Sequence, residues 1–200
     1  MRERFGFLII IIAAIALTSC STTRVLQDDQ YRLVRNKIEV TNDKNFNSGT
    51  LSPYLKQKPN PSIIFGWNPF LSVYNWSNGN GGLWDRLVKK VGQEPIIYDA
   101  DQVESSVDNI LDHLEYQGYY GSDVQSDIKV KGKKVSVTYN VTLGRRFPIE
   151  DISIDLPSRG EFRECFLQDT SAMTVRKGDF LSEAALEKES ERSSAAMRNV

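Results

Sequence analysis

Few side chains in this 200-residue chain could support covalent or acid–base chemistry, because it has two cysteines and one histidine. A thiol nucleophile activated by an imidazole would pair Cys165 with His113. Cys165, however, falls between Phe162 and Phe166 on an apolar face of a predicted helix, which favours a buried structural thiol. His113 follows Asp112 beside the apolar stripe of another predicted helix, where a histidine is usually a surface residue. We therefore expect no catalytic thiol–imidazole pair.

The other cysteine, Cys20, ends a segment with a different chemistry. A basic start precedes an almost purely apolar run, residues 5–17, which suits a signal peptide and is too short to span a bilayer comfortably. The tetrapeptide Leu17-Thr18-Ser19-Cys20 resembles the lipobox of bacterial lipoproteins, in which the thiol takes a diacylglyceryl group before cleavage. We expect residues 1–19 to be removed and Cys20 to be lipidated, because several acyl chains together hold a protein stably on a membrane.

The sequence also offers few residues that could bind a metal or act as paired catalytic carboxylates. With one histidine and one thiol expected to carry lipid, a zinc site would have to be completed by carboxylates. The acidic pairs Asp28-Asp29 and Asp99-x-Asp101 have the residue types of acid–base partners. The first pair lies in a polar tether, and the second begins a predicted helix, where acidic side chains complement the helix dipole. The sequence predicts no enzyme, no metal and no cofactor.

Composition limits the classes of partner and of fold. The 25 basic and 26 acidic residues nearly cancel, so nothing indicates nucleic acid as a partner. No later apolar run approaches the roughly 20 residues of a membrane helix. Since Cys165 is the only cysteine after Cys20, no intramolecular disulfide is expected, and hydrophobic cores must hold the mature chain together.

Hydrophobic periodicity predicts an α+β domain at residues 31–143, after a polar tether at 20–30. Its expected elements are a strand at 31–40, a short helix across Leu51, Tyr54 and Leu55, an insertion at 59–92, a helix between Asp99 and Gly118, and a hairpin that turns at 131–134. In the first strand only Ile38 and Val40 are cleanly in phase. In the long helix the expected apolar face comprises Val103, Val107, Ile110, Leu111 and Leu114. Helices are expected to cover one side of a small sheet.

The insertion at 59–92 holds all three tryptophans, at positions 67, 76 and 84, and a glycine-rich run at 78–82. This run lacks the Lys-Ser/Thr ending of a phosphate loop. The aromatic residues could cap a core or form an exposed docking patch, and we expect packing because aromatic rings are more often buried. Residues 83–91 predict a helix that lays an apolar stripe against the domain and ends at Gly92.

Residues 144–200 predict the start of a second unit with the same order of elements. Ile152, Ile154 and Leu156 alternate as a strand, a helix follows around 162–166, and another runs from about Ser182 to the end. No closing hairpin follows, so we expect this second unit to be incomplete and marginally ordered.

Two consecutive units begin with the same order of elements, which is strand, two helices, two strands in the complete unit. This order resembles the polypeptide-transport-associated (POTRA) repeats of outer-membrane barrel assembly proteins. The chain most resembles the lipoprotein members of the TamA/BamA-like family. Four stretches carry this resemblance: the lipobox, Tyr54 to Asn60, Glu94 to Tyr120 with Pro95-Ile96-Ile97-Tyr98-Asp99 and Gly118-Tyr119-Tyr120, and Gly178 to Asn199 with Gly178-Asp179-Phe180. Such proteins continue through further repeats into a membrane barrel, so the resemblance implies that 144–200 is a truncated repeat.

The resemblance also implies a function without catalysis. It implies an outer-membrane lipoprotein whose folded part is periplasmic, whose clients are unfolded outer-membrane proteins, and whose partner is a TamB-like bridging protein. POTRA repeats bind by adding an extended segment to an open sheet edge. We expect that edge on the first strand, at Ile38, Glu39 and Val40, because the strand at 135–143 is paired with its hairpin partner.

A binding module of another class is the alternative. Aromatic rings stack on sugar faces, so the tryptophan-rich insertion could serve a lipid-anchored adhesion or carbohydrate-binding protein. Loss of glycan binding on Trp67→Ala and Trp76→Ala, with envelope assembly unchanged, would favour this alternative.

Overall fold

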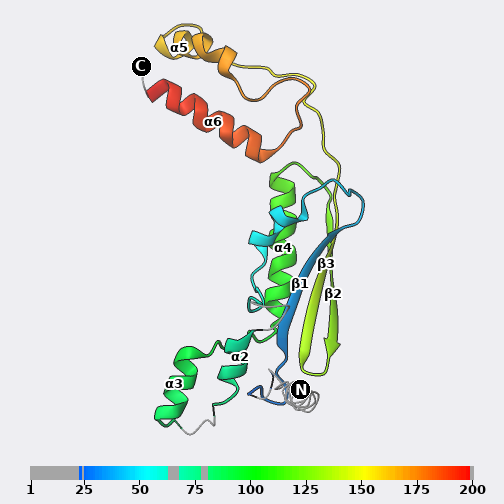
Figure 1. The fold of residues 1–200 in the computed structure, drawn as a ribbon. Helices are drawn as coiled ribbons and strands as arrows, with labels where there is room; N and C mark the ends of the chain where they lie inside the picture. Colours follow the sequence, from blue (N-terminus) through cyan, green and yellow to red (C-terminus); the bar gives the residue numbers. More distant parts are fainter. Residues whose placement is uncertain (1–22, 24, 63–67, 78–80, 199–200) are drawn as a thin grey trace, which may run out of the picture. The chain divides into compact units, whose positions relative to one another are not determined.

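A computed structural model describes residues 23, 25–62, 68–77 and 81–198 (Figure 1). The chain divides into two compact units, of which unit 1 comprises 1–36, 58–99 and 128–137, and unit 2 comprises 37–57, 100–127 and 138–200. The predicted signal peptide and Cys20 lie outside the described residues. In the described part, no helix combines the length and the apolar character needed to cross a bilayer.

The elements of the first domain follow the predicted order, with one further helix, at residues 69–74, that the sequence pattern did not predict, and the fold is α+β. They are β1 (Arg32–Val40), η1 (Ser48–Tyr54), α2 (Pro69–Tyr74), α3 (Leu83–Val91), α4 (Ala100–Tyr116), β2 (Asp123–Lys131) and β3 (Lys134–Thr142). The helix predicted across 51–55 is a 3₁₀ helix that ends before Leu55. Its first turn is capped by Asn47, whose Oδ1 accepts the Gly49 N–H at 3.0 Å, and Pro53 lies inside it.

The three strands form a mixed sheet in the order β1-β3-β2. A two-residue turn joins β2 to β3, and Gly132 supplies the positive φ of 58° that such a turn requires. β1 runs parallel to β3, because Arg32 N–H donates to Lys133 O at 2.8 Å and Thr41 N–H donates to Val141 O at 2.9 Å. The central strand of the sheet is therefore β3, and both β1 and β2 are edge strands.

The same two hydrogen bonds explain why the alternation in the first strand is blurred. From Arg32 to Thr41 the chain advances nine residues, while from Lys133 to Val141 it advances eight. β1 therefore contains one extra residue, as in a β-bulge. A bulge shifts the phase of the side chains, so the fully buried Leu33 is out of step with the half-buried Ile38.

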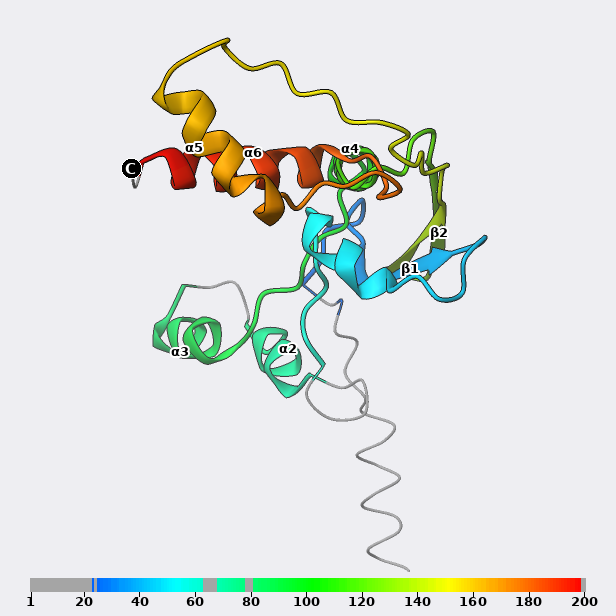
Figure 2. The ribbon, with the colours of Figure 1, turned by 90° about the horizontal axis from the view of Figure 1, so that it is seen from above.

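In unit 2, α4 covers one side of the sheet (Figure 2). The predicted apolar face is confirmed at Val103, Ile110 and Leu114, which are buried, and the remaining members, Val107 and Leu111, are half-buried. The sequence pattern missed Ser106, which is fully buried. Its hydroxyl donates to Gln102 O at 2.6 Å and accepts the Lys56 N–H at 2.9 Å, so burial leaves the hydroxyl satisfied.

Residues 144–198 contain α5 (Glu161–Asp169), η2 (Thr170–Ala172) and α6 (Glu183–Arg198), which confirm the two predicted helices. The strand predicted at 152–156 is wrong, since this stretch has no regular structure. Residues 147–149 pair instead with 178–181: Leu181 N–H donates to Phe147 O, and Ile149 N–H donates to Asp179 O, both at 2.8 Å. A strand forms only where its backbone groups find partners, and alternation alone does not supply them.

Candidate functional site

The outer edge of β1 is partly occupied by another segment of unit 1. Leu33 N–H donates to Ile96 O at 2.8 Å, and Tyr98 N–H donates to Tyr31 O at 2.7 Å. Arg32 and Ile97 form an antiparallel bridge between these bonds. The first residues of β1 therefore carry an extended segment of the same chain on their outer edge.

The residues predicted to bind, Ile38, Glu39 and Val40, lie at the other end of β1, in unit 2. All three are half-buried. Glu39 forms an ion pair with Lys37 on the same strand. Residues 96–98 reach the outer edge of β1 at Tyr31 and Leu33, seven and five residues before Ile38.

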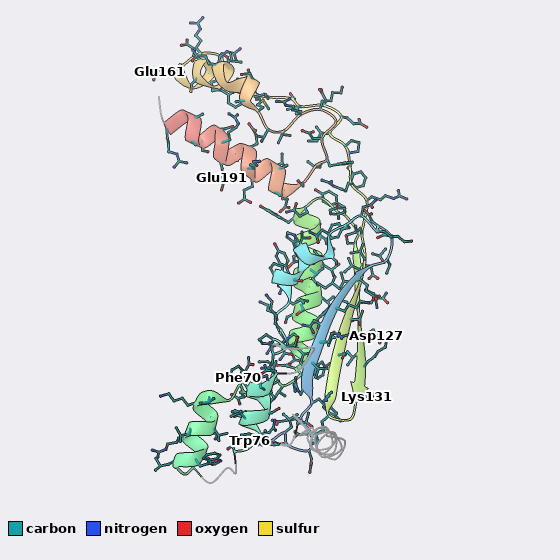
Figure 3. All side chains as sticks on the ribbon, viewed as in Figure 1. Phe70, Trp76, Asp127, Lys131, Glu161 and Glu191 are labelled. Carbon is teal, nitrogen blue, oxygen red and sulfur yellow. The ribbon has the colours of Figure 1, made fainter. Side chains whose placement is uncertain are left out.

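The prediction did not include the second edge, on β2. This strand is exposed at every residue except Val124. The hairpin turn places Ile128 opposite Val137 and Val130 opposite Val135, yet Ile128 and Val130 are 42% and 58% exposed while their partners are buried. Figure 3 labels Asp127 and Lys131 on this strand. The sequence showed the hairpin but not which of its strands becomes the sheet edge.

The candidate nucleophile, Cys165, and the candidate base, His113, lie on different helices, α5 and α4. The His113 ring stacks on Tyr54, with ring centroids 3.9 Å apart and planes inclined by 21°. Burial lowers the pKa of His113 below its usual value, which favours the neutral ring. Cys165 was expected to be buried, but it is only half-buried on α5, because few apolar side chains cover this region. Among the described residues, no group of three or more His, Cys, Asp and Glu side chains is arranged to hold a metal ion.

The insertion folds as a small helical hairpin of α2 and α3 within unit 1. Asn68 caps α2, accepting the N–H groups of Phe70 at 2.9 Å and Leu71 at 3.3 Å. Gly92 ends α3 as predicted, and a Cβ there would lie 2.7 Å from the Tyr74 backbone, so the two helices approach too closely for any larger residue. Specific contacts therefore fix the packing of α2 against α3.

Asp85 closes the other end of this hairpin. It is 3% exposed, and its carboxylate accepts the Gly81 N–H at 2.8 Å and the Ser77 hydroxyl at 3.1 Å. A buried carboxylate is retained where hydrogen bonds satisfy it. Asp85 thus fixes the start of α3 next to the residues that follow α2.

The aromatic and aliphatic side chains of the insertion are mostly exposed, contrary to the prediction of packing. Trp76 is 52% and Phe70 43% exposed, and both belong to the α2 part of the insertion (Figure 3). The predicted stripe of α3 is covered only at Val88. Its other members, Leu83, Trp84, Leu87 and Val91, are 57% to 80% exposed. Phe65 and Trp67 lie outside the described residues.

The end of the predicted tether is also attached to unit 1. Val25 N–H donates to Asn75 Oδ1 at 3.3 Å, next to the end of α2. The Lys133 ammonium donates to Gln27 O at 2.6 Å and lies 3.5 Å from the Asp28 carboxylate. Leu26 is buried. Residues 25–28, which were predicted as part of a polar tether, are thus part of the folded domain.

Comparison with known proteins identifies the repeat. A family model for POTRA, described as a surface antigen variable number repeat, matches residues 34–144, just over half of the chain. Among solved structures, a crystal structure of Haemophilus influenzae BamA POTRA3-5 is similar at 11% identity, with 86% of this chain and 88% of that chain covered and a TM-score of 0.30. Because the TM-score and the identity are both low, this similarity adds nothing to the family match. No curated protein matches the chain.

Proposed function

The chain belongs to the POTRA family, and from that premise we propose that it is a TamL-type lipoprotein of the outer membrane whose folded part is periplasmic. In this proposal, Cys20 carries the lipid. The repeat at 31–143 binds extended segments of unfolded outer-membrane proteins or of a TamB-like bridging protein by strand addition. The chain takes part in outer-membrane assembly as a binding module and catalyses no reaction.

The observation that supports strand addition most directly is the occupied end of β1. Residues 96–98 already lie along its outer edge in extended form, with two backbone hydrogen bonds and one bridge. A bound client would use the same kind of contact further along, at Ile38, Glu39 and Val40. Half-buried apolar side chains on that stretch would contact alternate side chains of the added strand.

The expected affinity suits clients of many sequences. Each backbone hydrogen bond contributes about 1 kcal/mol net, and backbone groups are the same in every client. Side-chain contacts at Ile38 and Val40 would add apolar burial without demanding a particular sequence. Such a site binds weakly and broadly, as a module that holds unfolded proteins must.

A photocrosslinking amino acid tests which edge is used. It would replace Glu39 on β1, Gln125 on β2 or Glu104 on the exposed side of α4, in the full chain, and an unfolded outer-membrane protein would be added. We expect capture from position 39 and none from position 104. Capture from position 125 alone would move the site to β2, and equal capture from all three positions would refute strand addition.

A separate measurement tests the anchor. Mass spectrometry of the protein from membranes should find Cys20 as an acylated first residue, and Cys20→Ala should release the chain from the membrane fraction. An intact leader with an unmodified thiol would refute the lipoprotein assignment without bearing on the β1 edge.

A further inference from the structure

One face of the α2–α3 insertion has an apolar surface that the sheet edges do not explain. At 100° per residue, Leu83, Leu87 and Val91 fall within an arc of about 80° on α3, and Trp84 borders it. These side chains are exposed, whereas Asp85 and Val88, on the other side of the helix, are buried. The helix therefore packs by the side that carries Asp85 and Val88, and its apolar arc faces outward.

Basic residues flank this apolar arc on one side. Arg86 and Lys90 fall next to Leu83 around the helix, within about 60° of it. Both are exposed, and the one acidic residue of α3, Asp85, is engaged with Gly81 and Ser77. An apolar stripe with aromatic residues, bordered by Arg and Lys, is the pattern of a helix that lies in the interface of an anionic membrane.

The chain leading to the lipidation site ends at this insertion. Val25 is bonded to Asn75, and Trp76, the next residue, is 52% exposed. Val25 is five residue steps after Cys20, and an extended chain of that length spans at most about 18 Å. If Cys20 is lipidated, as the proposed function holds, the bilayer surface must lie within that reach of the insertion.

We propose that the α2–α3 insertion is a membrane contact, in which the exposed arc of α3 enters the headgroup region of an anionic bilayer beside the lipid on Cys20. This inference rests on the proposed lipidation. It adds a second, protein-borne contact to the lipid anchor, with Leu83, Trp84, Leu87 and Val91 in the acyl boundary and with Arg86 and Lys90 at the phosphates. This contact would hold unit 1 against the membrane, whereas the lipid on Cys20 alone would attach it only through its N-terminal segment.

Fluorescence quenching of Trp84 tests the contact in the full, acylated chain. Trp67→Phe and Trp76→Phe leave Trp84 as the only tryptophan. The protein would be reconstituted in vesicles of phosphatidylcholine and phosphatidylglycerol, with or without bromine on the acyl chains. Because interfacial helices insert about 5–10 Å, we expect bromine to reduce Trp84 emission roughly twofold.

Three variants of that protein separate the contributions. Leu83→Glu with Leu87→Glu should abolish the quenching, while Leu186→Glu, a matched change at a 48% exposed leucine of α6, should leave it unchanged. Arg86→Gln with Lys90→Gln should reduce quenching in vesicles with phosphatidylglycerol to the level seen with phosphatidylcholine alone. Far-UV circular dichroism should be the same for all of them, because the substituted side chains are exposed.

The outcomes distinguish this inference from the proposed function. An anchored chain whose Trp84 is not quenched would overturn the membrane contact and leave the lipoprotein assignment intact. The same result with Trp84 emission that responds to added peptidoglycan fragments would overturn it in favour of glycan binding. Absence of an acyl group on Cys20 would instead refute the proposed function, through mass spectrometry and independently of the quenching.

Discussion

Residues 31–143 and residues 144–198 form regular helices alike, but different forces hold them. In the first region, buried apolar side chains come from both edge and central strands and from every helix, with Leu33, Ile110 and Tyr139 at most 1% exposed. In the second region, the one buried apolar side chain among those described is Val175. In the described part of this second region, α5 and α6 are therefore regular helices that enclose almost no apolar core.

Polar contacts take the place of packing in the second region. The Glu189 carboxylate accepts the Thr174 N–H at 2.6 Å and its hydroxyl at 2.7 Å, and the Arg192 guanidinium donates to it at 2.6 Å. These bonds tie α6 to the loop after η2. Contacts of this kind lie near solvent and are individually weak, so this region should open more easily than the first.

The largest expected difference between the regions is in how much the free energy of unfolding falls when a helix side chain is truncated to alanine. Ile110→Ala in α4 should lower the free energy of unfolding by about 2–5 kcal/mol, because it leaves a cavity under the sheet. Leu186→Ala in α6, at a 48% exposed position, should change it by less than about 0.5 kcal/mol. Urea denaturation followed by circular dichroism measures both, and equal costs would contradict the comparison.

A smaller effect is expected where the two regions meet within unit 2. Gly118 has φ +86°, and a Cβ there would lie 2.2 Å from Leu181 O. The strained φ should cost Gly118→Ala about 1–2 kcal/mol, and displacement of residue 181 about 1–3 kcal/mol more.

Gly121→Ala is the matched control for that variant. Gly121 also has a positive φ, +73°, but a Cβ there would meet no atom within 4 Å. It should therefore show the cost of the strained φ alone. If the two alanine variants unfold at the same urea concentration, the contact between Gly118 and Leu181 contributes nothing to stability.

The smallest expected effect is the pH dependence of the polar cluster. Hydrogen bonds from Arg192, with those of Thr174 and the attraction of the guanidinium, lower the pKa of Glu189 from 4.5 to about 2, against the opposing effect of burial. A carboxyl with a lowered pKa stabilises the fold above about pH 4.5 and loses that contribution as the pH falls through about 2.

Solvent screening keeps this contribution below about 1 kcal/mol. Amide hydrogen exchange at Thr174 should therefore accelerate between pH 4.5 and 2, after correction for the intrinsic rate. Glu189→Gln should exchange faster at pH 6 and lose most of the additional acceleration on acidification. An identical corrected pH profile in the variant would show that Glu189 does not hold the loop.

Local pattern was sufficient for most elements of the fold. The spacing of Val103, Ile110 and Leu114 identified α4, and strict alternation with Gly132 in the turn identified the β2–β3 hairpin. Both signals lie within one segment, so the sequence contains them completely. The strand predicted at 152–156 failed because pairing depends on a second segment, and 147–149 took the partner at 178–181 instead.

The candidate binding surfaces were only partly predictable. A partly blurred alternation indicated β1. The order β1-β3-β2, the segment 96–98 on the edge of β1 and the exposed edge of β2 depend on how distant segments pair. The amphipathic pattern of 83–91 likewise identified α3 but did not show which side packs. Asp85 decides that, because its buried hydrogen bonds to Gly81 and Ser77 orient the helix with Leu83 and Leu87 outward.

The sequence by itself determined the POTRA assignment and most of the order of the elements, since both depend on neighbouring residues or on spacing along one chain. Only the tertiary structure decided which strand edges and which side of α3 face solvent. The physical reason is that burial and hydrogen-bond pairing are relations between distant segments, and a periodic pattern shows that a face is apolar without showing what covers it.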